Sequence, residues 1–174
     1  MRKLYAFSGV IASGKTTAAR YLESEYGFVL LSFGNKLKEI VSLITPDNKI
    51  NKARDRKLLE FVGTNYYRNM DPDHWIIYVV NKIHHAWLEE KDVVIDDLRF
   101  KNEASVIMGL GGKLLQINTH SKISEERQIS RDHSRCITNH EAEKFTPESH
   151  TISHSFSNNG NLEEFQRDLK LYFS

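Results

Sequence analysis

A phosphate-binding pattern lies near the start of the chain. The eight residues from Gly9 to Thr16 read GVIASGKT and match G-x-x-x-x-G-K-[ST] in full. Glycines let the backbone turn its N–H groups inward, and the lysine brings an ammonium group to the β- and γ-phosphate oxygens of a nucleotide. Thr16 offers a hydroxyl to Mg²⁺. The predicted triphosphate contacts are Gly9, Ala12, Ser13, Gly14, Lys15, Thr16 and Thr17.

A second group of chemically active residues, DDLR, runs from Asp96 to Arg99 after the apolar run 93–95. Ligands of parallel α/β sheets bind outside the carboxyl ends of the strands, where these residues are expected to lie. A carboxylate there can hold a water on Mg²⁺, and the planar fork of Arg99 suits a phosphate. The alternative is an aspartate–arginine pair on a surface loop, and the presence of a phosphate loop argues against it.

The apolar segments of the chain are expected to position both groups at the ends of strands. Five short apolar runs predict strands. They are 3–8, 28–33, 92–96, 113–117 and 150–156. Helical periodicity lies between them, and 35–90 is expected to be largely helical, with Asp71 capping a helix that has Pro72 in its first turn. Strands that alternate with helices predict a parallel α/β sheet with crossover connections.

Size and charge narrow the class of protein. At 174 residues the chain fits a single domain, 1–174. Its 24 basic and 23 acidic side chains leave a formal charge of +1, which favours neither a nucleic-acid nor a membrane-surface partner. Apolar runs such as 75–80 are far shorter than the roughly 20 residues that span a bilayer. The single cysteine, Cys136, fits a reducing compartment, so we expect a cytoplasmic protein.

Several stretches, in matching order, resemble the bacteriophage deoxynucleoside monophosphate kinases, a group within the P-loop nucleoside monophosphate kinases. GVIASGKTTAARYL (9–22) looks like the opening of that family, and FGNKLKEIV (33–41) is similar to its F-A-D-P-L-K-E segment. LLEFVGTNYYRNMDPDHWI (58–76) resembles L-L-Q-x-x-G-T-x-x-x-R followed by D-x-x-x-W. DDLRFKNEASVI (96–107) is similar to D-V-R-F-x-N-E-A-x-x-I, and NNGNLEEF (158–165) to N-x-G-x-L-E-E-L.

The resemblance implies a fold, an activity and a set of partners. The fold is a P-loop NTPase three-layer α/β sandwich, a five-stranded parallel sheet flanked by helices, with a helical acceptor-binding region at 33–90 and a lid at 119–149. The activity is transfer of the γ-phosphoryl group of ATP, with Mg²⁺, to a deoxynucleoside 5′-monophosphate in nucleotide biosynthesis. Small-molecule nucleotides would be the partners, in a host cytoplasm if the protein is viral, and a homodimer is compatible. Asn35 and Lys101 replace the family's usual aspartate and proline, which bears on acceptor-base preference.

Transfer between phosphates requires positioning and charge neutralisation rather than a general base, because the acceptor oxygen is already ionised. Lys15 and Thr16 are assigned to ATP and Mg²⁺. The resemblance aligns the family's aspartate with Asp97, so Asp97 is assigned to a metal-bound water, with Asp96 as its rival. Arg99 is assigned to the acceptor phosphate or to the group in transfer. The predicted catalytic residues are Lys15, Asp97, Arg99, Arg127 and Arg131.

The polar section 118–149 is predicted to form a lid with one or two short helices. Arg127, Arg131 and Arg135 recur every four residues, so on a helix they would share one face and could close over the transferring phosphoryl group. Closure would exclude water and prevent wasteful hydrolysis. The alternative for such a charge run is a solvated face.

The acceptor side is predicted mainly from the resemblance. Arg68 is a candidate for a second acceptor contact, and Trp75 could flank the acceptor base. The alternatives are a solvated arginine at a helix end and an ordinary core tryptophan. Lysines after the second strand could reach acceptor phosphates or lie on the surface. The predicted substrate-binding residues are Lys36, Lys38, Arg68, Trp75, Arg99 and Glu103.

Two other functions stay open from the sequence. A kinase of the same fold could act on another phosphorylated acceptor, of the dephospho-coenzyme A or phosphomevalonate type. A nucleotide-binding regulator with slow hydrolysis would bind a triphosphate without acceptor-dependent turnover. The guanine-reading signature N-K-x-D of many GTPases is not matched, because residues 35–38 read NKLK.

Overall fold

A five-stranded parallel sheet forms the centre of the molecule, in the order β2-β3-β1-β4-β5. The computed structural model describes residues 2–45, 47–51, 54–132 and 146–174. The strands are β1 (Leu4–Ser8), β2 (Val29–Leu31), β3 (Val93–Ile95), β4 (Lys113–Asn118) and β5 (Ile152–Ser157). All five lie within or overlap the predicted strand segments, which confirms the predicted α/β class.

Helices connect the strands on both faces of the sheet. They are α1 (Lys15–Tyr26), α2 (Gly34–Ser42), α3 (Arg56–Glu60), the π-helix η1 (Phe61–Arg68), α4 (His74–Leu88), α5 (Lys101–Gly109), α6 (Ser121–Asp132), the 3₁₀-helix η2 (Ser149–Thr151) and α8 (Leu162–Phe173). Among the described residues, no helix is long and apolar enough to cross a membrane.

The central strand β1 explains the layering. All its residues are buried, and successive side chains of a strand point to opposite faces. Leu4 and Ala6 pack into a cluster with α4 and α5, whereas Tyr5 and Phe7 pack with α1 and α8. The sheet is therefore buried on both faces between two helical layers, as expected for parallel strands.

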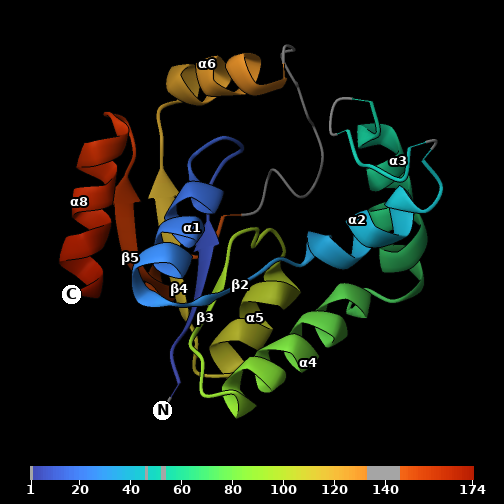
Figure 1. Cartoon of the computed structure of the whole chain (residues 1–174), viewed down its shortest axis with the longest axis horizontal. Helices are drawn as coiled ribbons and strands as arrows, with labels where there is room; N and C mark the ends of the chain where they lie inside the picture. The colour runs from blue at the N-terminus through green and yellow to red at the C-terminus, as the bar shows by residue number, and fades with distance from the viewer. Residues whose placement is uncertain (1, 46, 52–53, 133–145) are drawn as a thin grey trace.

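Two parts of the chain extend beyond this sandwich. In Figure 1, α2 and α3 lie to one side of the sheet, and α6 lies beyond the ends of the strands, near the loop between β1 and α1. The predicted acceptor-binding region, 33–90, contains α2, α3, η1 and α4, and α4 packs directly on the sheet core. The predicted lid, 119–149, contains α6, while 133–145 lies outside the described residues.

The start of α4 differs from the prediction. Asp73 rather than Asp71 is the N-cap residue, and Pro72 precedes the helix. The carboxylate of Asp71 instead accepts the N–H of Asp73 at 2.9 Å. An aspartate side chain readily accepts the backbone N–H two residues further along the chain, which forms a turn. Asp71 therefore lies in the turn before α4 and does not cap the helix.

A π-helix replaces the regular helix expected before residue 68. Gly63 is buried within it, and an added Cβ there would overlap the side chain of Leu37. The carbonyl oxygen of Gly63 accepts a hydrogen bond from Trp75 Nε1 at 3.0 Å. A side chain that takes a helix carbonyl favours irregular helix geometry, and π-helical turns frequently occur at functional sites.

Candidate active site

The phosphate loop joins β1 to α1 and has the backbone that its glycines permit. Gly9 has a φ of 142° and Gly14 a φ of 106°, and Ala12 between them is also left-handed, with a φ of 58°. A Cβ on Gly9 would overlap the carbonyl oxygen of Ile117, and one on Gly14 would overlap the amide of Asn158. Both glycines are therefore required by conformation and by close approach.

Lys15 and Thr16 begin α1 directly after this loop. Lys15 Nζ donates to the carbonyl oxygens of Gly9 and Val10 at 2.7 and 2.8 Å, so the ammonium group lies across the loop. Thr16 Oγ1 donates to Asp96 Oδ2 at 2.7 Å. The N-terminus of a helix, an ammonium group and inward N–H groups together make an anion site.

The loop is braced from the far edge of the sheet. The carbonyl oxygen of Ser13 accepts from Asn158 Nδ2 at 2.8 Å and from Thr119 Oγ1 at 3.2 Å. Arg127 Nη1 and Nη2 reach the carbonyl oxygens of Asn158 and Gly160 at 3.0 and 3.3 Å. Among the described residues, Ser13 Oγ is buried without a hydrogen-bond partner, which fits a loop built for an oxygen-rich ligand.

The first of the two aspartates after β3 faces the phosphate loop. Asp96 accepts from Thr16 Oγ1 at 2.7 Å and from Ser32 Oγ at 2.5 Å. A hydroxyl and a carboxylate are the hard oxygen ligands that suit Mg²⁺, which commonly binds through one or two protein groups and phosphate oxygens. The residues that fit a metal ion are therefore Thr16 and Asp96.

The contacts of Asp97 favour a different role from the predicted one at a metal-bound water. Its two carboxylate oxygens accept the backbone N–H groups of Phe33 and Gly34, at 2.8 and 2.9 Å. Burial, and next the charge of Asp96, raise the pKa of Asp97 above its usual value. Neighbouring side chains at a strand end point to opposite sides, so only one aspartate can face the loop. Asp97 instead anchors the start of α2.

One cavity of about 980 Å³ connects the phosphate loop to the helices of 33–90. Such a volume lies at the upper end of the range for small-molecule sites. Four basic side chains from α2, α3, η1 and the segment after β3 line it: Lys38, Arg56, Arg68 and Arg99. The predicted triphosphate contacts Ala12, Ser13, Gly14, Lys15, Thr16 and Thr17 line the same cavity. The cavity therefore has basic groups for a second anion besides a triphosphate.

Two arginines on the acceptor side are joined through one carboxylate. Arg68 Nη2 lies 2.6 Å from Glu103 Oε1, and its guanidinium lies over the Phe100 ring, 3.9 Å from the ring centroid. Glu103 Oε2 accepts the backbone N–H groups of Arg99 and Phe100 at 2.9 and 3.1 Å. Burial raises the pKa of Glu103 to about 7, although the charge of Arg68 lowers it. Glu103 therefore holds the guanidinium of Arg68 and the backbone of Arg99 at the same time.

Trp75 has features of a core tryptophan and also of a residue that could flank the acceptor base. It is 2% exposed and donates to Gly63 O, as a core tryptophan would, and it also lines the cavity.

The two lysines of α2 that were predicted to bind substrate have different surroundings. Lys38 lines the cavity, with Nζ 3.4 Å from Asn35 Oδ1.

Lys36, which was also predicted to bind substrate, is not among the residues that line the cavity. Its ammonium group pairs with Glu39 at 2.9 Å and lies 5.5 Å from the centroid of the Tyr78 ring. Successive residues of a helix point in directions about 100° apart, so Lys36 and Lys38 cannot face the same side of α2. Lys36 therefore lies on the surface.

The arginines of the predicted lid are described only in part. Arg127 lines the cavity from α6, held on the loop after β5. Arg131 lies in α6, but its side chain is not among those described, and Arg135 lies outside the described residues. Closure of a lid by these arginines stays a prediction.

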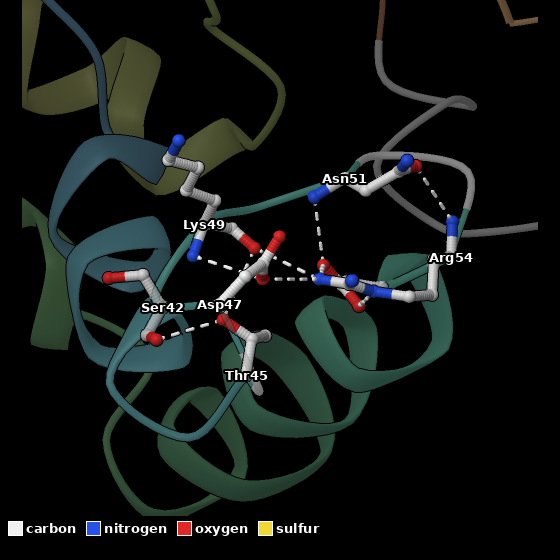
Figure 2. Close-up of polar contacts among 7 residues, drawn as sticks. Ser42, Thr45, Asp47, Lys49, Asn51 and Arg54 are labelled. Atoms are coloured by element: carbon white, nitrogen blue, oxygen red, sulfur yellow. Dashed lines mark hydrogen bonds and ion pairs between the residues drawn. The ribbon is translucent and has the colours of Figure 1, made fainter.

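Sequence reasoning missed Arg56, the first residue of α3, which lines the cavity. A local network fixes the chain just before it (Figure 2). Arg54 Nε and Nη2 hold the carboxylate of Asp55 at 2.6 and 2.9 Å, and the same carboxylate accepts Asn51 N–H at 2.8 Å. Arg54 Nη2 also reaches Lys49 O at 3.0 Å. No motif marks these residues, because their contacts are set by the loop itself.

A parallel sheet with a phosphate loop after its central strand is typical of P-loop proteins, and solved structures of similar fold support this class. A dephospho-CoA kinase from Campylobacter jejuni aligns over 99% of this chain and 96% of its own, with a TM-score of 0.55 and 17% identity. A shikimate kinase from Bacteroides thetaiotaomicron aligns over 98% and 96%, with a TM-score of 0.60 and 14% identity. The chain has the P-loop fold of small-molecule kinases.

The sequence is also similar enough to one known viral protein to show its family. The "Putative deoxynucleotide monophosphate kinase" of Acanthamoeba polyphaga mimivirus is 32% identical over 168 residues, a match that covers 79% of this chain and 85% of the viral protein. The chain belongs to the family of that viral protein. No protein-family model matches the sequence.

Proposed function

We propose that the protein transfers the γ-phosphoryl group of ATP to a deoxynucleoside 5′-monophosphate, giving ADP and the diphosphate. One observation carries the proposal: a phosphate loop with its Thr16–Asp96 pair and a second group of basic side chains line one cavity. The name of the viral relative supports a deoxynucleotide as the acceptor. A site with two anion-binding ends suits transfer between two phosphorylated substrates better than hydrolysis.

The donor end would hold ATP through the loop N–H groups and Lys15. Thr16 and Asp96 are the residues that would hold Mg²⁺, which neutralises phosphate charge when it is bound. The ammonium group of Lys15 already crosses the loop at its carbonyls, 2.7 and 2.8 Å away, and phosphate oxygens would replace these acceptors. Arg127, held beside the loop, would cover the nucleotide from α6.

The acceptor end would hold the monophosphate through Arg99 and Arg68, with Lys38 and Arg56 as further cations on the cavity wall. Arginine matches phosphate with a planar pair of donors, which fixes both position and orientation. An acceptor phosphate is ionised at neutral pH, so the site needs no general base. These residues would therefore align two anions that otherwise repel each other, which is how such transfer is accelerated. Trp75, Leu37 and Leu59, which line the same end, offer an apolar wall for the base.

An acceptor panel tests the proposal. ADP release from ATP is measured with each deoxynucleoside monophosphate, each ribonucleoside monophosphate, dephospho-coenzyme A and phosphomevalonate. We expect release to depend on a deoxynucleotide, with dGMP and dTMP as the first acceptors to try. Turnover with dephospho-coenzyme A or phosphomevalonate alone would assign a different acceptor to the same fold. ATP binding without any acceptor-dependent release would identify a nucleotide-binding regulator. Cytoplasmic action and a homodimer stay predictions.

A further inference from the structure

Glu103 occupies an unusual position for a charged side chain. It lies in the first turn of α5 and is 1% exposed. Burying a carboxylate is costly unless charged or hydrogen-bonding partners surround it. Its partners are Arg68 from η1 and two N–H groups of the segment that follows β3. The side chain therefore joins two segments that are far apart in the sequence and that both reach the acceptor end of the cavity.

The two oxygens of Glu103 hold different partners. Oε1 binds the guanidinium of Arg68 at 2.6 Å, and Oε2 binds the backbone N–H groups of Arg99 and Phe100 at 2.9 and 3.1 Å. The Phe100 ring, whose backbone this carboxylate holds, lies under the Arg68 guanidinium. Arg68 is thus fixed from one side by the carboxylate and from another by a ring attached to the same anchor. A change at Glu103 should move both arginines relative to each other.

We propose that Glu103 is a positioning residue that sets the relative placement of Arg68 and Arg99 for the acceptor phosphate, and that it does not itself bind substrate. The inference rests on the proposed function and deepens it. Two like-charged guanidinium groups beside one anion must be held at a fixed spacing to bind it on two sides. The buried carboxylate also offsets the positive charge of Arg68 before the acceptor arrives.

A purely structural role is the competing account, since Glu103 also accepts the backbone N–H of Phe100, the N-cap residue of α5. The two accounts differ in what the variant changes. A lost cap lowers the stability of α5 and leaves the kinetics of the folded enzyme unchanged. A lost anchor for Arg68 and for the segment of Arg99 raises the KM of the acceptor while the KM of ATP stays the same, because Glu103 holds Arg68 and the segment after β3, whereas Lys15 and Thr16 contact the loop carbonyls and Asp96.

The test uses Glu103→Gln in the full chain. An amide has one acceptor oxygen where the carboxylate has two, so it cannot serve both Arg68 and the two N–H groups. We expect the acceptor KM to rise by about tenfold or more, the scale of a hydrogen bond to a charged group, with the KM of ATP within about twofold. Glu25→Gln, an exposed glutamate on α1, is the matched control and should keep both values.

A double-variant comparison separates the role from general damage. If Glu103 acts through Arg68, the effect of Glu103→Gln on the acceptor KM should shrink when Arg68→Ala is already present. Effects that multiply independently, a rise in both KM values, or unchanged acceptor kinetics would each overturn the inference. If Glu103→Gln does not fold, Glu103→Asp keeps the charge but shortens the reach, and a wild-type acceptor KM there would overturn it.

Failure of the proposed function can be distinguished from failure of the inference about Glu103. No turnover by the wild-type chain with any deoxynucleotide would overturn the proposed function and the inference together. An active wild type whose Glu103→Gln variant keeps its acceptor KM would overturn the inference alone.

Discussion

The two ends of the cavity are built in different ways. The donor end is built around one continuous segment, 9–16, whose shape follows from two glycines and the start of a helix, with Asp96 beside it. The acceptor end is assembled from α2, α3, η1 and the segment after β3, joined by side chains such as Glu103 and Asp97. Local backbone geometry therefore sets most of the first, and side-chain contacts between distant segments set the second. Substitutions at one end of the cavity should therefore change different kinetic constants from substitutions at the other end.

The largest effect is expected at the donor end, from Lys15→Ala. Removal of the ammonium group from the transferring phosphate should lower kcat by about 100-fold or more, while the circular dichroism spectrum stays the same. Lys36→Ala serves as the control, because Lys36 pairs with Glu39 outside the cavity. Wild-type kcat in Lys15→Ala would remove the phosphate loop from the mechanism.

Arg99→Ala should break the acceptor end alone. Loss of a guanidinium that faces a phosphate should lower kcat/KM for the acceptor by about 30-fold or more, with ATP affinity within about threefold of wild type. Steady-state kinetics and ATP titration measure the two quantities. Arg167→Ala, on an exposed position of α8, should change neither. Equal losses for ATP and acceptor would contradict the division into two halves.

The adjacent aspartates offer the sharpest contrast between the halves. Asp96→Asn should raise the Mg²⁺ concentration required for half-maximal rate by about tenfold, since Asp96 faces Thr16. Asp97→Asn should leave the Mg²⁺ requirement unchanged and raise the acceptor KM, because Asp97 holds the N-terminus of α2. Mg²⁺ titrations of both variants compare them, and the reverse pattern would restore Asp97 as the metal-linked residue.

The last expected effect is on stability rather than on catalysis. The pKa of Glu103 is about 7 in the folded protein against an ordinary 4.5, so the native state holds the proton more tightly than the unfolded chain. Its contribution to the free energy of unfolding therefore falls as pH rises from about 4.5 to about 7, by on the order of 3 kcal/mol.

Urea unfolding between pH 5 and 8 should show this fall in the wild type relative to Glu103→Gln. The lowered pKa values of Asp47 and Asp55 act at more acidic pH and in the opposite direction, so they do not mask it. Parallel pH curves for the two proteins would show that the acceptor end carries no such buried titrating group.

What the sequence could predict follows the same division. The phosphate loop was predictable because its chemistry lies in eight consecutive residues whose types are dictated by backbone conformation. The five strands of a parallel α/β sheet followed from alternating apolar periodicity, which is also local, whereas their order did not. These confirmed predictions concern features in which neighbours along the chain are also neighbours in space.

The acceptor end resisted prediction for a physical reason. A strand end presents Asp96 and Asp97 to opposite sides, and only the packing of α2 decides which one faces Thr16. The same holds for the two lysines of α2, since the helix face that meets the cavity is set by contacts of Leu37 with Gly63. Arg56 depends on a loop network that no pattern marks. Tertiary contacts of this kind leave no periodic signal in the sequence.

Transfer of a labelled phosphoryl group tests the central claim most directly. The protein is incubated with ATP labelled at the γ-phosphate, Mg²⁺ and one deoxynucleoside monophosphate at a time, and the labelled products are separated. We predict that the label appears in a deoxynucleoside diphosphate, and that Arg99→Ala abolishes most of this transfer while ATP still binds. Label that appears only as inorganic phosphate, at a rate independent of every deoxynucleotide, would contradict a two-substrate site.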